Sequence, residues 1–306
     1  MVRDGQSSSM QEPDLNITAT SYIDIPTVLL QSEAKGGGDA TFTAAVCVLA
    51  AVAGWVVVRG RLYKSPRDAA GRLPKDALLG IIAAMVFSIV GTLGAMGAQA
   101  LALEDPDYAR LAQGVFGNTA QLALALLVIQ SAFFVDATRA TARPRTELTE
   151  GVIGFALATP IVFALSFVIV QAMTLLGYPP VPETSHATLR ILEAKGDALF
   201  TVLTLAHVAL LVPLAEEAGY RGLLQPSLRR AGLGGTAAAF ATAVLFAAIH
   251  WSAIPPEGRA AGLPMLVVLG FAMGILRERT GGILAPTVLH AAFNALNVWI
   301  TLARDG

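Results

Sequence analysis

Long stretches without charged side chains are the feature that most limits how this chain can fold. A helix needs about 20 mostly apolar residues to cross the hydrocarbon core of a bilayer. We expect eight membrane-spanning helices, the seventh of them short, within residues 40–58, 77–103, 111–135, 151–182, 198–230, 231–256, 260–276 and 280–302. A membrane β-barrel would instead show segments of about ten residues with alternating hydrophobicity, and the sequence has none. The predicted fold is an all-α, polytopic membrane helix bundle.

The composition agrees with a membrane protein and excludes several other classes. Hydrophobic residues make up 55% of the 306 residues and charged residues 14%, whereas soluble domains carry about 25% charged residues. The net charge of -1 argues against a nucleic-acid partner. The single cysteine, Cys47, rules out an intrachain disulfide and a cysteine-ligated metal site.

The chain divides into three parts. Residues 1–39 are polar, lack the pattern of a cleavable signal peptide, and are expected to form a disordered tail. Residues 40–197 hold the first four predicted helices and no motif that we can assign. Residues 198–302 hold the last four helices and almost all the ionisable residues at membrane depth, where such residues usually mark function.

The distribution of basic residues predicts how the helices are oriented. If the N-terminus lies outside, the loops on the inner side carry fourteen Lys and Arg residues and the outer segments carry seven. Because basic residues collect on the cytoplasmic side, we expect both termini to be non-cytoplasmic. The expected location is a bacterial cytoplasmic membrane.

The most unusual of these apolar segments contains Glu216, Glu217 and Arg221. Glu217 and Arg221 are four residues apart, so they share a helix face and can pair. Glu216 points about 100° away and is expected to face a cavity. Pro213, just before the pair, is expected to kink the helix, which we expect to continue to about Arg230.

Later apolar segments bring further polar residues to the same depth. Glu216 lies about 16 residues before the turn at residues 231–235, and His250 lies about 16 residues after it. An antiparallel helix pair would therefore place the two side chains level with each other. His290 and Asn294 share a face of the last helix. His290 reaches this depth only if the preceding turn at residues 281–282 dips into the membrane.

Other interpretations of these residues are structural. A buried Glu–Arg pair can be a brace or a transporter gate, and a single histidine inside a membrane can simply link two helices. We assign His207 and His186 to such structural roles, because His207 points away from Glu216 and His186 lies in a predicted outer loop.

Three motifs in order resemble one family of intramembrane proteases. They are Glu216-Glu217-Ala-Gly-Tyr-Arg221, Phe246-Ala-Ala-Ile-His250 and His290-Ala-Ala-Phe-Asn294. This order is similar to the CAAX protease and bacteriocin-processing (CPBP, Abi) family, which includes the type II CAAX prenyl endopeptidases. The resemblance covers residues 198–302.

The resemblance implies an endopeptidase with a polar site inside the bundle. Glu216 would be the general base that activates water, with His250 beside it. His290 and Asn294 would stabilise the oxyanion. Glu217, Arg221 and Phe246 would organise the site. The substrate would be a membrane-embedded or membrane-anchored peptide or protein, and neither prenyl recognition nor the oligomeric state follows from the sequence.

Metal use and the class of activity stay open at this point. Glu216, His250 and His290 could bind Zn²⁺, whose catalytic sites often use two histidines and one carboxylate. The family is commonly labelled metalloprotease, although a metal-free glutamate mechanism is also proposed for it, and the compact H-E-x-x-H zinc motif is absent here. The alternatives to an enzyme are an ion- or proton-coupled transporter and a catalytically silent membrane scaffold or immunity protein.

Overall fold

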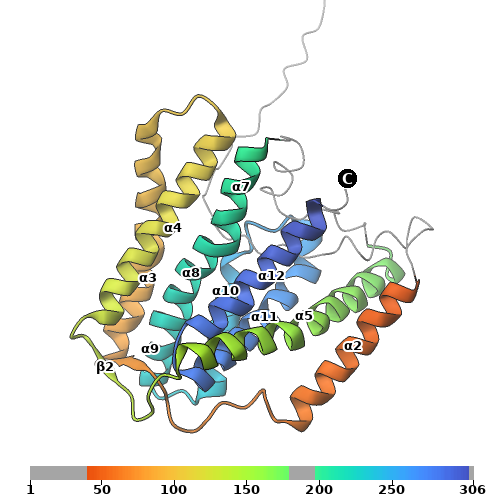
Figure 1. Cartoon of the computed structure of the whole chain (residues 1–306), viewed down its shortest axis with the longest axis horizontal. Helices are drawn as coiled ribbons and strands as arrows, with labels where there is room; N and C mark the ends of the chain where they lie inside the picture. Colours follow the sequence, from red (N-terminus) through yellow and green to blue (C-terminus); the bar gives the residue numbers. More distant parts are fainter. Residues whose placement is uncertain (1–39, 179–196, 303–306) are drawn as a thin grey trace, which may run out of the picture.

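The predicted all-α bundle is confirmed by the computed structural model, which describes residues 40–178 and 197–302 (Figure 1). The predicted tail 1–39 and His186 lie outside the described residues. The described part forms eight helices. They are α2 (Ala40–Arg59), α3 (Ala77–Gly97), α4 (Pro106–Gln130), α5 (Pro144–Leu175), the continuous helix Ala198–Arg230, α10 (Gly235–Ile249), α11 (Arg259–Thr280) and α12 (Leu284–Leu302).

Five of these helices are long and apolar enough to cross a membrane. They span Ala77–Leu101, Pro106–Gln130, Pro144–Leu175, Ala198–Arg230 and Pro256–Thr280. The remaining apolar helices, α2, α10 and α12, have shorter apolar stretches. All eight predicted segments are thus helical, and five of them satisfy the length and hydropathy expected of a span.

Several predicted helix boundaries were wrong. They were placed where stretches without charged residues begin and end, whereas capping residues and prolines set the actual helix ends. α4 begins at Pro106 rather than at residue 111, since Asp105 caps its first turn by accepting from the amides of Asp107 and Tyr108. α5 begins at Pro144, a residue suited to the first helical position. α11 was predicted to be short, but it continues to Thr280, past Arg277.

The long helix Ala198–Arg230, called the central helix below, runs through the middle of the molecule. It comprises α7 (Ala198–Ala206), α8 (Val212–Glu217) and α9 (Gln225–Arg230), joined by two π-helical turns, His207–Leu211 and Ala218–Leu224. The α3–α4 hairpin lies on one side of it, and α10, α11 and α12 lie on the other (Figure 1). α5 packs against α11 and α12, and α2 packs on α5.

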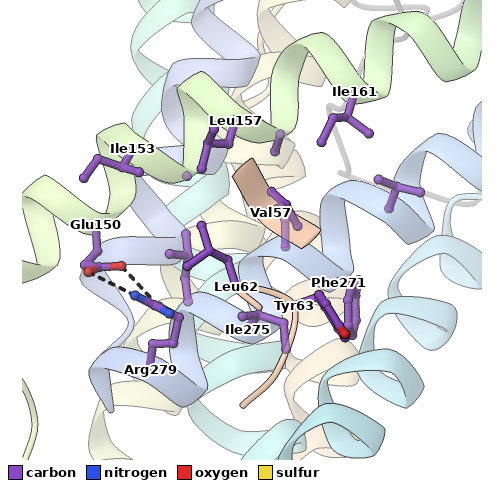
Figure 2. Close-up of a pocket in the computed structure, with 15 residues that line it drawn as sticks. Val57, Leu62, Tyr63, Glu150, Ile153, Leu157, Ile161, Phe271, Ile275 and Arg279 are labelled. Carbon is purple, nitrogen blue, oxygen red and sulfur yellow. Dashed lines mark hydrogen bonds and ion pairs between the residues drawn. The ribbon is translucent and has the colours of Figure 1, made fainter. Parts of the chain in front are cut away.

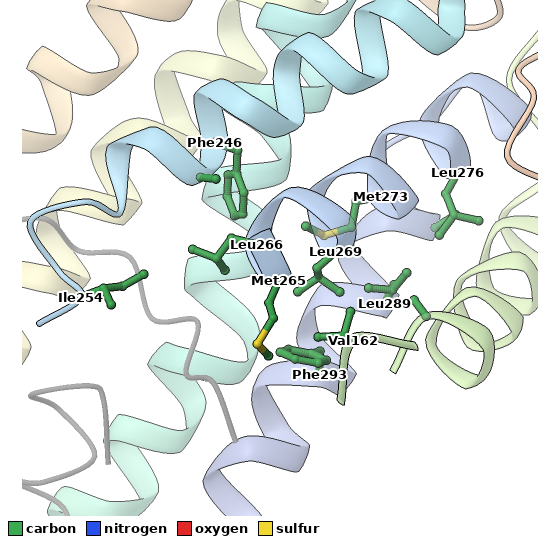
Figure 3. Close-up of a cluster of buried hydrophobic side chains, with 13 residues drawn as sticks. Val162, Phe246, Ile254, Met265, Leu266, Leu269, Met273, Leu276, Leu289 and Phe293 are labelled. Carbon is green, nitrogen blue, oxygen red and sulfur yellow. The ribbon is translucent and has the colours of Figure 1, made fainter. Parts of the chain in front are cut away.

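The largest apolar core lies between α5, α10, α11 and α12. It includes Val162, Phe246, Leu269, Leu289 and Phe293, all at most 1% exposed (Figure 3). A second cluster joins the central helix to α3 and α4 through residues such as Phe87 and Leu223. The central helix is therefore enclosed by packed side chains on both sides, and its polar residues are kept from lipid.

Small residues let the helices approach closely where no side chain separates them. A Cβ built on Gly117 in α4 would lie 2.9 Å from the carbonyl oxygen of Gly91 in α3, and one on Gly274 in α11 would lie 2.8 Å from the Cβ of Ala239 in α10. Interfaces of this kind are typical of membrane helices, whose association depends on packing rather than on hydrophobic burial.

One end of the bundle gathers the loops at residues 60–76, 131–143, 231–234 and 281–283. The first two loops contain seven Arg and Lys residues, and the helix ends before the other two carry Arg229, Arg230, Arg277 and Arg279. We call this end of the bundle the basic-loop end. Strand β1 (Arg72–Pro74) pairs antiparallel with β2 (Phe134–Asp136) there. The end of α11 lies beside the interior of the central helix. Arg277 Nε donates to the carbonyl of Arg221, which is nine residues before the central helix ends. Arg277, one turn before the loop, is therefore level with the interior of the central helix rather than with its end, and its guanidinium also binds the carbonyls of Ala70 and Arg72. Whether the turn enters the membrane stays a prediction.

We predict that Gly71→Ala destabilises the protein, because this loop has no room for a side chain. A Cβ on Gly71 would lie 1.8 Å from the carbonyl oxygen of Gly281, and Gly71 has a φ of 78°. Left-handed backbone alone costs about 1–2 kcal/mol for a residue with a Cβ. Thermal unfolding in detergent should therefore show a clearly lower Tm. Gly97→Ala is the matched control, since nothing lies within 4 Å of its Cβ position; equal Tm values for the two variants would contradict the prediction.

Candidate functional site

The polar residues of the three motifs converge on the middle of the central helix. We call Glu216, Glu217, Arg221, His250, His290 and Asn294 the buried polar cluster. Each is at most 5% exposed. Since the central helix is covered on both sides, these groups face one another and the protein interior rather than lipid. The sequence prediction that they lie at one depth is supported by the contacts described below.

Pro213 and the first π-helical turn explain how α12 is attached to the central helix. The amide of Val212 donates to His207 O, five residues back. In the same register the carbonyl of Val208 would accept from residue 213, but proline has no N–H. Asn294 Nδ2 donates to this carbonyl instead, at 3.0 Å. The predicted disturbance at Pro213 thus takes the form of a π-helical turn whose vacant acceptor is bound by a motif residue.

The predicted pair of Glu217 and Arg221 is confirmed as a fully buried ion pair. Arg221 Nη1 lies 2.8 Å from Glu217 Oε1, and both side chains are 0% exposed. Arg221 Nη2 donates to the carbonyl of Gly270 in α11 at 2.9 Å, and the guanidinium carbon lies 4.8 Å from the centre of the Phe246 ring. Arg221 therefore connects the central helix to both α10 and α11.

His290 lies between the two glutamates. Its Nδ1 is 3.0 Å from Glu217 Oε1, and its Nε2 is 3.8 Å from Glu216 Oε2. Because the carboxylate of Glu217 already accepts from Arg221, Nδ1 is assigned the hydrogen and donates it to the same oxygen. The 3.8 Å separation from Glu216 exceeds a hydrogen bond and is the distance of an ion pair when the ring is protonated.

His250 is held by the backbone of its own helix. Its Nδ1 is 2.6 Å from the carbonyl oxygen of Phe246, so Nδ1 is assigned the hydrogen, and Nε2 can accept a hydrogen bond when the ring is neutral. The Phe246 ring lies 4.7 Å from the His250 ring and 6.1 Å from the His290 ring, centre to centre. Both imidazoles therefore pack on one phenyl ring.

The contacts of Phe246 support the depth predicted from the sequence. Phe246 meets the Tyr220 ring at 5.2 Å, edge to face. Because α10 runs antiparallel to the central helix, His250, one turn farther along α10, is level with the turn before Tyr220, which contains Glu216 and Glu217.

Sequence analysis missed polar residues that extend the cluster towards the basic-loop end. Gln225 Nε2 donates to Gly274 O and to Glu278 Oε1, both at 2.9 Å, and the three groups are buried. Gln225 lies four residues after Arg221, so the i, i+4 spacing that joined Glu217 to Arg221 could have identified it.

His207 has the structural role predicted for it. Its Nε2 lies 2.9 Å from Asn118 Oδ1 in α4, and the ring is 2% exposed. The histidine therefore links the central helix to α4 of the α3–α4 hairpin.

Within residues 40–178 and 197–302, no three His, Cys, Asp or Glu side chains lie close enough together to hold a metal ion. His290 Nδ1 faces Glu217 and His250 Nδ1 faces a backbone carbonyl, so Nε2 is the nitrogen of each ring that could bind a metal. We derive no step of the reaction from a bound metal.

We predict that the buried ion pair of Glu217 and Arg221 contributes far more to stability than the partly exposed ion pair of Glu150 and Arg279. Arg221→Met leaves Glu217 buried without its partner, which costs about 3–5 kcal/mol, and its Tm in detergent should fall sharply. Arg279→Gln, which breaks a pair of side chains 32% and 28% exposed, should cost about 0–1 kcal/mol. The double variant Glu217→Gln/Arg221→Met should recover part of the loss. Similar Tm losses for Arg221→Met and Arg279→Gln would contradict this prediction.

Comparison with known proteins identifies the family of this part of the chain. Residues 198–296 match the family described as Type II CAAX prenyl endopeptidase Rce1-like. No curated protein and no solved structure matches the chain. The matched segment holds all three motifs and confirms the resemblance to type II CAAX prenyl endopeptidases that they predicted. Together with the apolar helices, the match makes this an integral multi-pass membrane protein and supports a general role as an intramembrane protease. Over residues 198–296 the chain is therefore similar to the type II CAAX prenyl endopeptidase Rce1-like family.

Proposed function

We propose that the buried polar cluster hydrolyses a peptide bond of a membrane-embedded or membrane-anchored protein or peptide, with Glu216 as the general base. The observation that carries this proposal is the position of Glu216. Its carboxylate is 5% exposed and faces His290 Nε2 across 3.8 Å. A water molecule beside these two groups can hydrogen-bond to both of them, and hydrolysis consumes such a water.

In the proposed reaction, Glu216 takes a proton from this water as the oxygen attacks the carbonyl carbon of the substrate. The acceptor nitrogen of His250 orients the same water. When the tetrahedral intermediate collapses, Glu216 returns the proton to the nitrogen of the leaving amine. Water has then added across the peptide bond, and the enzyme is unchanged.

His290 and Asn294 are proposed to stabilise the oxyanion. With Glu217 accepting from Nδ1, His290 donates to the oxyanion from Nε2 as the imidazolium, in which both ring nitrogens are donors. Asn294 Nδ2 uses one hydrogen on the Val208 carbonyl and has a second. Both donors sit on the buried face of α12, so their positions are set before substrate binds.

The deciding experiment uses purified wild type and Glu216→Gln with a library of membrane-anchored peptides. Loss of a general base lowers the rate about 10²–10⁴-fold, whereas the shape of the side chain and the Tm should be preserved. His250→Ala should also lose cleavage. His207→Ala is the matched control: it removes a buried histidine of the same central region, so it should lower the Tm but leave cleavage per folded molecule close to wild type.

Three results would contradict this assignment. Equal cleavage by wild type and Glu216→Gln would remove Glu216 as the base. Proton-coupled uptake lost in the variant, without cleavage by either protein, would favour a transporter. Activity that is lost on chelation and restored by zinc would require a metal, which the proposed mechanism does not use.

We also propose that both termini lie outside the cytoplasm of a bacterial cell. The basis is the excess of Arg and Lys in the loops that the structure gathers at one end of the bundle.

Thiol labelling of intact cells tests this orientation. In a Cys47→Ala background, a membrane-impermeant reagent should label Leu103→Cys, between α3 and α4, and should label Lys64→Cys, at the basic-loop end, only after the cells are opened. Both native side chains are exposed, so access across the membrane decides the result. The reverse pattern would invert the topology.

A further inference from the structure

A separate cavity of about 430 Å³ lies between α2, α5 and α11, away from the buried polar cluster (Figure 2). It is lined by apolar side chains such as Val57, Ile153, Leu157 and Phe271, with Glu150 and Arg279 at one end. Its volume falls within the range of about 300–1,000 Å³ that holds small molecules. The family match covers only one of its walls, α11, since α2 and α5 precede residue 198.

The cavity and the proposed catalytic site use opposite faces of α11. Gly270 and Gly274 turn their carbonyls to Arg221 and Gln225 of the central helix. The cavity is lined instead by Ile275 and Arg279, which at 100° per residue lie on the far side of the same helix. A ligand in this cavity would therefore not touch Glu216, His250 or His290.

The length of the cavity matches one leaflet of a bilayer. Glu150 and Ile161 on α5 are eleven residues apart, and so are Val268 and Arg279 on α11. Eleven residues extend about 16 Å along a helix, and half of the hydrocarbon core is about 15 Å. The apolar walls thus run from the charged pair to about the middle of the membrane. Ile153 is 47% exposed, so the cavity reaches the lipid-facing surface.

The charged end is suited to a phosphodiester. Arg279 Nε is 3.2 Å from Glu150 Oε2 (Figure 2), and both side chains remain partly exposed. Leu62 and Tyr63 also line the cavity, with Tyr63 beside Phe271 (Figure 2), and they lie between the exposed residues Arg61 and Lys64. No acidic residue occurs in the segment 57–67. The α2 side of the cavity therefore adds basic residues to Arg279, and basic residues attract anionic lipid.

We propose that this cavity binds one phospholipid from the leaflet at the basic-loop end, with an acyl chain between α5 and α11. The phosphate lies at Arg279, which can bind it with two parallel N–H donors. Glu150 holds the guanidinium in place in the absence of lipid and competes with the phosphate for it. The lipid fills the space between α2 and the rest of the bundle, so it acts as a bound component of the fold rather than as a substrate.

The test is native mass spectrometry of the delipidated full chain titrated with phosphatidylglycerol. Wild type should retain one lipid. Leu157→Trp fills the cavity and should weaken retention by about tenfold or more. The matched control is Leu127→Trp on α4, where the native side chain is 72% exposed to lipid but lines no part of this cavity, and it should bind as wild type does.

The charged pair gives two variants with opposite expected effects. Arg279→Gln should weaken binding about tenfold, in the range for a lost charge-assisted hydrogen bond, and should reduce the preference for phosphatidylglycerol over a diacylglycerol with the same chains. Glu150→Gln removes the competing carboxylate and should tighten binding several-fold. Equal weakening by both variants would mean that the pair is only a brace, and it would overturn the proposal.

Two further results separate this proposal from its alternatives. Glu216→Gln should still retain the lipid, so a failure of the proteolytic assignment would leave this inference intact. Displacement of the lipid by an isoprenoid alcohol at equal concentration, or equal binding by Leu157→Trp and wild type, would show that the cavity is not a phospholipid site.

Discussion

The structure depends on a single buried carboxylate oxygen, Glu217 Oε1, which lies within 3.0 Å of both Arg221 Nη1 and His290 Nδ1. Through Arg221 it is linked to the backbone of α11 at Gly270, and through His290 it is linked to α12. A charge in this position is costly unless every hydrogen bond around it is made. The helices are therefore held in one register, since sliding any of them by a turn would leave an unpaired charge in the bundle.

This arrangement leaves Glu216, the neighbouring carboxylate, in a different environment. Glu217 is bound by a cation and an imidazole, whereas Glu216 stands 3.8 Å from the far nitrogen of the same imidazole. Two adjacent residues thus have different contacts: Glu217 is tied into the helix packing, and Glu216 is the residue proposed to activate water. Such a division is consistent with the principle that preorganised groups around a reacting centre lower its barrier. The phospholipid proposed on the far face of α11 would support the same helix from its other side.

The residues that meet in the buried polar cluster could be predicted from the sequence to a large extent. Ionisable side chains inside apolar segments are rare enough to select Glu216, Glu217, Arg221, His250 and His290 directly. Counting residues from the turns placed His250 level with Glu216, and it required the turn before α12 to dip into the membrane, which stays a prediction. The roles of individual atoms could not be predicted. Asn294 binds the Val208 carbonyl because a π-helical turn precedes Pro213. This turn could not be predicted, since a count of 100° per residue assumes a uniform α-helix.

The sequence alone determined that this chain is a helical membrane bundle and which side chains need partners, because the cost of exposing backbone and charge to hydrocarbon depends on composition and segment length. Tertiary structure decided which partners those side chains have. Arg277 is an example: by sequence it belongs in a loop, yet it lies within α11 and binds the carbonyls of Arg221, Ala70 and Arg72. Those acceptors come from segments more than 50 residues away, so their meeting follows only from how the helices pack.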